Sequence, residues 1–321
     1  MRILKSSFAL LIWIILSILA NLFILSVFLK NLIKVQNRKV LEVADNPNEQ
    51  LVRFIERSLS QVPLDLDEGL GTVYERRVMQ NFLSRLQEEY GIRIVLESPA
   101  DGISGMPGLN SLEFGKRKGE VILSSPSLKL LTKVRVIWEK EETMDKVQLI
   151  QSEVNLFPFS SNSFDLVWNF CILERFFRPE VFVSEMKRVS RQYILLVIQN
   201  RYNVGTILHR VYHRFMGQVW DHGYSQQMRL KTLRQIAQNC NLKILEIGAI
   251  DTPPSMDTWD MPLRGELKRV MSLLGKEWKW KATSKKEKSR FLGFLMRLER
   301  DLPHWFNLFQ THHLYLLAQK G

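Results

Sequence analysis

The stretch LFPFSSNSFDLV, residues 156–167, decides the fold of this chain. It closes a polar loop and then starts an apolar run that carries an acid near its beginning. Further along the chain, EMKRVSR (185–191) precedes a second apolar run, YILLVI (193–198). Short apolar runs bounded by polar loops favour buried strands, and the segment between these two has helical spacing. The stretch therefore predicts a strand over 164–170, a helix over 180–189 and a strand over 193–198.

The same alternation of short apolar runs and helical segments continues on both sides of this unit. Alternating strands and helices favour an α/β fold in which a mainly parallel sheet is covered on both faces. The sequence alone sets no strand order. Further strands are predicted over 93–97, 119–123, 146–150, 242–250 and 313–318, and further helices over 72–90, 109–114, 128–141 and 230–240.

The strand, helix and strand with PF-x-x-x-SFD in front resemble the central part of class I S-adenosylmethionine-dependent methyltransferases of type 11. The resemblance covers residues 74–250. It implies a Rossmann-like, doubly wound sheet of seven strands in the order 3-2-1-4-5-7-6, mainly parallel with the last strand antiparallel. It also implies S-adenosyl-L-methionine as the cofactor, bound outside the carboxyl ends of the strands where their order reverses.

The resemblance also assigns cofactor contacts to the turns that follow the strands. The first strand ends in the acid Glu97 of ESPADGISGMPG (97–108), where the family has a Gly-x-Gly-x-Gly-like turn. The second ends in Ser124, where the family has a carboxylate for the ribose, so the chain departs from the pattern there. A plain turn after Glu97 and an exposed loop glutamate at Glu153 are the competing interpretations. The expected contacts are Glu97, Asp101, Gly102, Gly105, Ser124, Glu153 at the adenine position, Val154 and Asn169.

Catalytic groups are expected in the segment WDHGY, residues 220–224. Asp221 and His222 form a candidate acid–base pair, because methyl transfer to oxygen or nitrogen needs a proton removed near neutral pH. The competing interpretation is a loop whose side chains hydrogen-bond its own backbone. No metal is expected, because His209, His213 and His222 are loosely spaced and have no cysteine partner.

The N-terminal part of the chain predicts a membrane anchor. Residues 8–29 are uncharged, and as a helix these 22 residues would span about 33 Å, enough for a bilayer core. A cleaved signal peptide is the alternative, but no small-x-small cleavage site follows. More basic side chains follow the stretch than precede it, which favours a cytoplasmic catalytic domain. The predicted organisation is an anchor with basic flanks (1–39), a helical linker or cap (40–90), whose first helix also fits a stalk, and a methyltransferase domain (91–321).

A basic segment, residues 264–300, lies near the C-terminus. It holds twelve Lys and Arg against four Glu, so 12 − 4 = +8 of the chain's net charge of +12 is concentrated there. Trp278 and Trp280 alternate with lysines, which is typical of a surface that lies on anionic lipid headgroups. Nucleic acid binding and a solvated run of charge are the alternatives, and a membrane tether disfavours the first.

Two functional hypotheses follow from these features. The first is a single-pass cell-membrane methyltransferase with a cytoplasmic catalytic domain and a small, amphipathic or lipid-like acceptor. The second is a non-catalytic scaffold or binding protein that kept the fold, suggested by Pro99, Asp101 and Ser124 at cofactor positions. Cys171 and Cys240 lie far apart in apolar contexts, which indicates neither a disulfide framework nor a zinc site.

Overall fold

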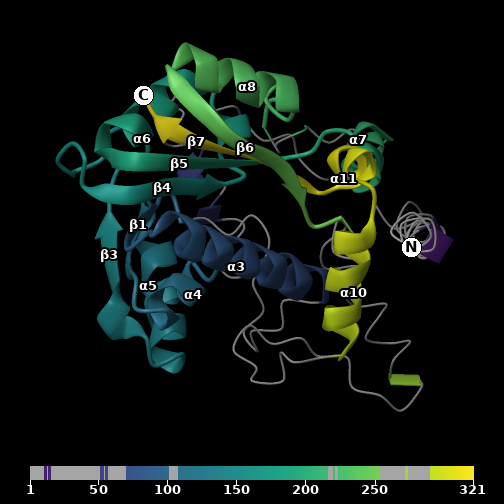
Figure 1. Ribbon diagram of the computed structural model, residues 1–321, viewed down its shortest axis with the longest axis horizontal. Coiled ribbons are helices and arrows are strands. Elements are labelled where there is room, and N and C mark those ends of the chain that lie inside the picture. Colours follow the sequence, from purple (N-terminus) through teal and green to yellow (C-terminus); the bar gives the residue numbers. More distant parts are fainter. Residues whose placement is uncertain are drawn as a thin grey trace.

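A computed structural model describes residues 70–100, 108–215, 220, 223–252 and 290–321, together with short helical pieces at 11–12, 14–15, 51–53, 55–56 and 272–273. Within these residues, seven strands form one sheet in the order β3-β2-β1-β4-β5-β7-β6 (Figure 1). The strands are β1 (Ile94–Glu97), β2 (Glu120–Ser125), β3 (Val147–Gln151), β4 (Phe164–Phe170), β5 (Ser190–Gln199), β6 (Leu242–Ile250) and β7 (His313–Lys320).

The strand directions confirm the expected doubly wound sheet. β1 pairs in parallel with β2 and β4, while β2 pairs in parallel with β3 and β4 with β5. β7 runs antiparallel to both β5 and β6. The strand order reverses between β1 and β4, so the carboxyl ends of these two strands border the crevice where such sheets bind ligands.

Helices cover both faces of the sheet. On one side α3 contacts α4, and α5 packs on β2 and β3; on the other side α6 and α8 contact each other and pack on strands β4 to β7 (Figure 1). The helices are α3 (Leu70–Tyr90), α4 (Leu112–Lys116), α5 (Leu128–Lys140), α6 (Pro179–Val189), α7 (Val204–Phe215), α8 (Leu230–Asn239), α10 (Arg290–Asp301) and α11 (His304–Gln310), with 3-10 turns at Met144–Lys146 and Leu173–Arg175.

The core is densest around the central strands. Residues 194–198 of β5 are all fully buried, as are Leu166, Val167 and Trp168 of β4. Continuous apolar runs of this kind are typical of parallel strands that helices cover on both faces. Met79 and Leu83 place α3 in the same core, so this helix is part of the domain's packing.

The acid near the start of β4 holds the start of β1. The carboxylate of Asp165 accepts hydrogen bonds from the backbone N–H groups of Arg93, at 2.9 Å, and Ile94, at 3.0 Å. Arg191 lies 3.3 Å from the same carboxylate. The SFD part of the sequence motif thus joins the amino ends of neighbouring strands, because it satisfies backbone donors at the start of β1.

The loop before β4 is held by α6. The guanidinium of Arg188 donates to the carbonyls of Phe157, at 3.0 Å, and Phe159, at 2.7 Å. Glu185 accepts from Arg188 and from the backbone N–H of Phe157, at 2.8 Å. Charge-assisted bonds of this kind are among the stronger polar contacts in proteins. The two segments that carry the family resemblance are therefore each other's structural partners.

One helix was not predicted from the sequence, and one predicted segment lies mostly outside the described residues. The segment after β5 forms the helix α7, which was not predicted from the sequence; its apolar residues recur at helical spacing between basic ones. In the described part of the chain, no helix combines the length and apolar character that a bilayer crossing needs. The predicted span over residues 8–29 lies mostly outside that part.

Candidate functional site at the carboxyl edge of the sheet

The carboxyl ends of β1 to β6 and the start of the antiparallel β7 meet along one edge of the sheet, which we call the carboxyl edge. Polar side chains, most of them buried, lie along it in two groups. The cofactor half consists of Glu97, Ser98, Ser111 and Ser124, and the histidine half consists of Glu75, Glu174, Asp251, Glu299, His312 and His313.

Glu97 lies where the sequence predicts it, at the end of β1 and fully buried. Its carboxylate accepts a hydrogen bond from the hydroxyl of Ser111, at 2.5 Å, and the indole N–H of Trp168 donates to the same hydroxyl at 3.2 Å. Ser111 directly precedes α4. The acid of the first turn is thus fixed between β1, β4 and the start of α4.

Ser124 ties the ends of β1 and β2 together. Its hydroxyl donates to the hydroxyl of Ser98 at 2.6 Å, and its carbonyl accepts from the backbone N–H of Ala100 at 2.7 Å. Both serines are buried. A hydroxyl is a weaker acceptor for a ribose than a carboxylate, so this strand end is less polar than the family pattern implies.

Asn169 lies near the end of β4 as predicted, and its side chain points to the face of the sheet that α6 covers. Its amide nitrogen lies 3.3 Å from the sulfur of Met186 on α6, whereas Trp168 points toward Ser111. Successive side chains on a strand alternate between faces, which explains the separation of Asn169 from Glu97. The side-chain oxygen of Asn169 is buried and has no hydrogen-bond partner among the described residues.

The remaining predicted contacts divide into two groups. In the loop after β3, Glu153 is exposed and Val154 is buried in the main core. The exposure of Glu153 agrees with the competing interpretation as well as with a ligand contact. Asp101, Gly102, Gly105, Asp221 and His222 lie outside the described residues.

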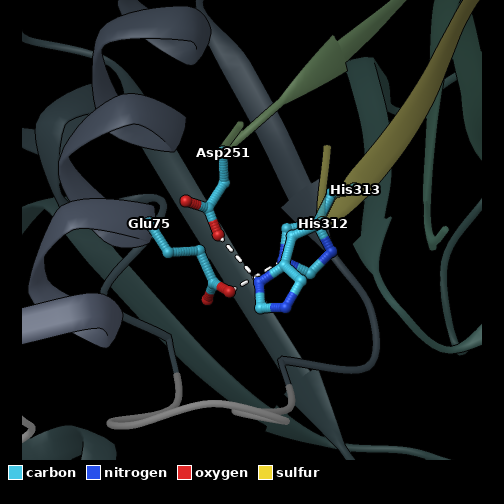
Figure 2. Close-up of side chains that lie close together, drawn as sticks. All are labelled: Glu75, Asp251, His312 and His313. Carbon is cyan, nitrogen blue, oxygen red and sulfur yellow. Dashed lines mark hydrogen bonds and ion pairs between the residues drawn. The ribbon is translucent and has the colours of Figure 1, made fainter. Parts of the chain in front are cut away.

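Two histidines at the start of β7 meet carboxylates from distant parts of the chain. His313 Nε2 lies 2.7 Å from the carboxylate of Glu75 on α3, and its Nδ1 lies 3.2 Å from the thiol of Cys171. His312 Nδ1 lies 3.0 Å from the carboxylate of Asp251, which follows β6. Figure 2 shows these side chains converging from the helix and from the two strand ends.

Glu299 of α10 reaches the same place. Its carboxylate accepts hydrogen bonds from the hydroxyl of Tyr74 and from the backbone N–H of Asp251, the latter at 2.9 Å. Burial, reinforced by the nearby carboxylate of Asp251, raises the pKa of Glu299 to about 7. The basic segment therefore also contributes an acid, Glu299, to the histidine half.

Glu174 is the second acid of this half with a strongly shifted pKa. It is buried in the turn after β4, and burial raises its pKa to about 7. One carboxylate oxygen accepts from the backbone N–H of Gln199 at 3.2 Å, and the other has no hydrogen-bond partner among the described residues. A carboxyl group with a pKa near neutral is suited to exchanging a proton with a bound molecule.

The sequence did not point to the histidine half. His312 and His313 are adjacent in the chain, but their partners lie 61 and 238 positions away. Spacing along the chain carries no signal for such pairs. A weaker signal existed in the Leu173-Glu174-Arg175 turn, where an acid comes four residues after the end of β4.

The comparisons with known proteins agree with this architecture. Residues 104–198 match the family model described as a methyltransferase domain. No curated protein sequence is similar enough to the chain to count as a relative.

Two solved structures are similar over most of the chain. The [4+2]-cyclase SpnF is 12% identical, with a TM-score of 0.53 over 88% of this chain and 99% of its own. Magnesium protoporphyrin IX methyltransferase from Synechocystis PCC 6803, solved with bound S-adenosylmethionine, is 9% identical, with a TM-score of 0.52 over 88% of this chain and 100% of its own. At these sequence identities, the similarity shows the fold alone. The chain thus has the fold of the class I methyltransferases, and its central part matches a methyltransferase domain.

Proposed function

We propose that the chain is an S-adenosylmethionine-dependent methyltransferase of class EC 2.1.1.-. The observation that carries the proposal is the sheet order 3-2-1-4-5-7-6 with a reversed β7, together with the methyltransferase domain match over residues 104–198. A fold alone does not fix a function. The proposal therefore also depends on the chemistry of the carboxyl edge.

The cofactor half suits the sulfonium nucleoside in part. A buried carboxylate, Glu97, and the hydroxyls of Ser98 and Ser124 stand at the ends of β1 and β2, next to the point where the strand order reverses. These groups offer acceptors and donors to a ribose and an amino acid moiety. When bound, the cofactor supplies a methyl group that its sulfonium already activates. The chain's own residues then orient it, exclude water and hold the acceptor in line.

The methyl acceptor is proposed to bind beside Glu174, between the two halves of the carboxyl edge. Glu174 carries a carboxylate oxygen that can accept a proton, and its raised pKa keeps it responsive near neutral pH. Tyr224 donates its backbone N–H to the carbonyl of Glu174, and Gly223 lies close to the same carbonyl. These contacts bring the end of the 220–224 segment to the carboxyl edge. They support the proposal that Asp221 and His222 act there as an acid–base pair.

The acceptor is proposed to be small and amphipathic or lipid-like, and the enzyme to be a single-pass protein of the cell membrane with a cytoplasmic catalytic domain. Support comes from the uncharged stretch 8–29 and the +8 charge of residues 264–300. Leu11, Ile14 and Ile15 are helical and half exposed, as expected of residues that face lipid. Deleting residues 8–29 should release the protein into the soluble fraction without changing its cofactor affinity.

A second candidate function is a non-catalytic scaffold or binding protein. The observation in its favour is that Ser124 bonds Ser98 and Ser111 bonds Glu97, so the polar groups of the cofactor half satisfy one another. The similarity in fold to the [4+2]-cyclase SpnF also shows that proteins with this fold carry out different reactions.

Methyl transfer to a membrane extract separates the two candidates. The full chain in detergent micelles is incubated with methyl-labelled S-adenosylmethionine and the extract, and label is counted in the organic and aqueous phases. We expect label in the organic phase and a fall of roughly 100-fold or more in rate for Glu174→Gln. Glu139→Gln, an exposed substitution on α5, is the matched control. No incorporation above heat-inactivated protein in either phase would favour the scaffold.

A further inference from the structure

We propose that Glu75, Asp251, His312 and His313 form a structural binding site for one divalent zinc-like ion. Each of the four side chains offers a ligand atom, and these atoms all lie within 4.8 Å of one another. Around a tetrahedral zinc with bonds of about 2.1 Å, ligand atoms are about 3.4 Å apart. The four side chains face one another (Figure 2). Rotations that bring their ligand atoms together by up to about 1.4 Å would therefore close the site around an ion.

Charge favours a cation at this position. Two carboxylates and two neutral imidazoles carry a charge of −2, which one divalent ion neutralises. The side chains are 8% exposed for Glu75, 2% for Asp251, 14% for His312 and 6% for His313. Burying carboxylates is costly unless they are paired or coordinate a metal. An ion would thus stabilise a group that the fold has already withdrawn from water.

The ligands are held by separate elements of the fold. Glu75 comes from α3, and Asp251 follows β6. His313 is the first residue of β7, and His312 directly precedes it. The backbone N–H of His312 donates to the carbonyl of Asp251 at 2.9 Å, and His313 is paired with both β5 and β6. The β6 and β7 ends are therefore fixed relative to each other before any ion binds. An ion would join them to α3.

Groups around the four ligands suit metal coordination. With Nε2 of His313 on the ion, its Nδ1–H would donate to the sulfur of Cys171, which lies 3.2 Å away. A metal-bound histidine usually has such a partner on its other nitrogen, which sets the ring orientation. The backbone N–H of Asp251 is held by Glu299 at 2.9 Å, so this residue is also supported from α10.

The ligand set selects the class of metal and the role of the site. Two imidazoles with two carboxylates suit zinc and neighbouring first-row ions, whereas calcium and magnesium prefer oxygen ligands throughout. A site with four protein ligands leaves no coordination position open for a substrate or water, which is typical of a structural ion. The inference does not depend on the proposed methyltransferase function, because its test measures metal and stability without cofactor.

The test uses the full chain without a polyhistidine tag. Metal content is measured after purification without chelator, and chelator-stripped protein is then titrated with Zn²⁺ and with Co²⁺, whose visible absorption reports tetrahedral coordination. We expect about one zinc per chain, an intense cobalt spectrum that zinc abolishes, and a higher melting temperature with zinc. No bound metal, no cobalt spectrum and no change in melting temperature would overturn the proposal.

Variants locate the ion. We expect His312→Gln and Asp251→Asn to lose the cobalt spectrum, and Cys171→Ala to weaken zinc binding by about 10-fold to 100-fold as a lost partner of His313. His304→Ala, an exposed histidine of α11, is the matched control and should bind as the unchanged chain does. Circular dichroism verifies folding, and if both ligand variants unfold, Cys171→Ala decides. Full cobalt binding by folded His312→Gln and Asp251→Asn would also overturn the proposal. If both ligand variants unfold, unchanged zinc affinity in Cys171→Ala would overturn it.

Discussion

The two halves of the carboxyl edge differ in both charge and chain distance. The cofactor half surrounds one carboxylate with serine hydroxyls, and its bonds join residues 14 and 26 positions apart. The histidine half gathers four carboxylates and two histidines, and its pairs span 61 to 238 positions. The first half follows from the strand ends that the sequence predicts. The second exists because the end of β6, the start of β7 and α3 meet in the folded domain.

The largest expected effect concerns the packing under the cofactor half. Replacing Trp168 with Ala removes a fully buried indole and its bond to Ser111, and should lower the free energy of unfolding by about 3–5 kcal/mol. Urea unfolding followed by circular dichroism measures it. Trp305→Ala removes an indole that is 65% exposed and should cost less than about 0.5 kcal/mol. Equal losses in both variants would contradict the assigned packing.

The next effect tests the raised pKa of Glu174 in the histidine half. The pKa of Glu174 is raised from 4.5 to about 7, so the folded state holds a proton that the unfolded state releases between these values. Stability should therefore fall as pH rises through this window, by about 3 kcal/mol for this group. Glu174→Gln should remove that part of the slope and be the more stable protein at pH 8. Unfolding free energies from pH 4.5 to 8 measure it, and a slope identical to that of the unchanged chain would contradict the assignment.

A smaller effect tests the acid of the cofactor half. Glu97→Gln should weaken binding of S-adenosylhomocysteine by about 1–3 kcal/mol if the carboxylate accepts a hydrogen bond from the ligand. Titration calorimetry gives the dissociation constant. Glu120→Gln, exposed at the opposite end of β2, is the matched control and should leave it unchanged. An affinity unaffected by Glu97→Gln would exclude Glu97 from the cofactor site.

The smallest effect concerns the bond between β1 and β2. Ser124→Ala removes the 2.6 Å hydrogen bond to Ser98 and should cost about 1 kcal/mol of unfolding free energy. We expect a similar loss in S-adenosylhomocysteine affinity if Ser124 contacts the ribose. A loss of stability with full affinity would restrict Ser124 to joining the two strands.

Much of the fold was predictable from local pattern. β4 and β6 begin and end where the apolar runs do, and Gly91, with a φ of +64°, ends α3 as expected. The family-like motif was informative for a structural reason, because Asp165 and Arg188 hold backbone groups of β1 and of the loop before β4. α7 was not predicted, although its apolar residues recur at helical spacing.

The candidate site was predictable only where it depends on strand ends. Glu97 and Ser124 follow from the end of a strand and the polarity of the turn after it. Asn169 lies at the predicted strand end with its side chain on the face opposite that of Trp168, and its contact with the cofactor stays a prediction. Tyr74 and Glu299 meet through the packing of α3 against α10, which no spacing in the sequence indicates.

Binding of S-adenosylhomocysteine to the full chain tests the central claim most directly. Titration calorimetry in detergent micelles should give saturable binding at micromolar concentration with about one site per chain. Heat that never exceeds the dilution background, even at millimolar ligand with a folded protein, would contradict a cofactor site at the carboxyl edge.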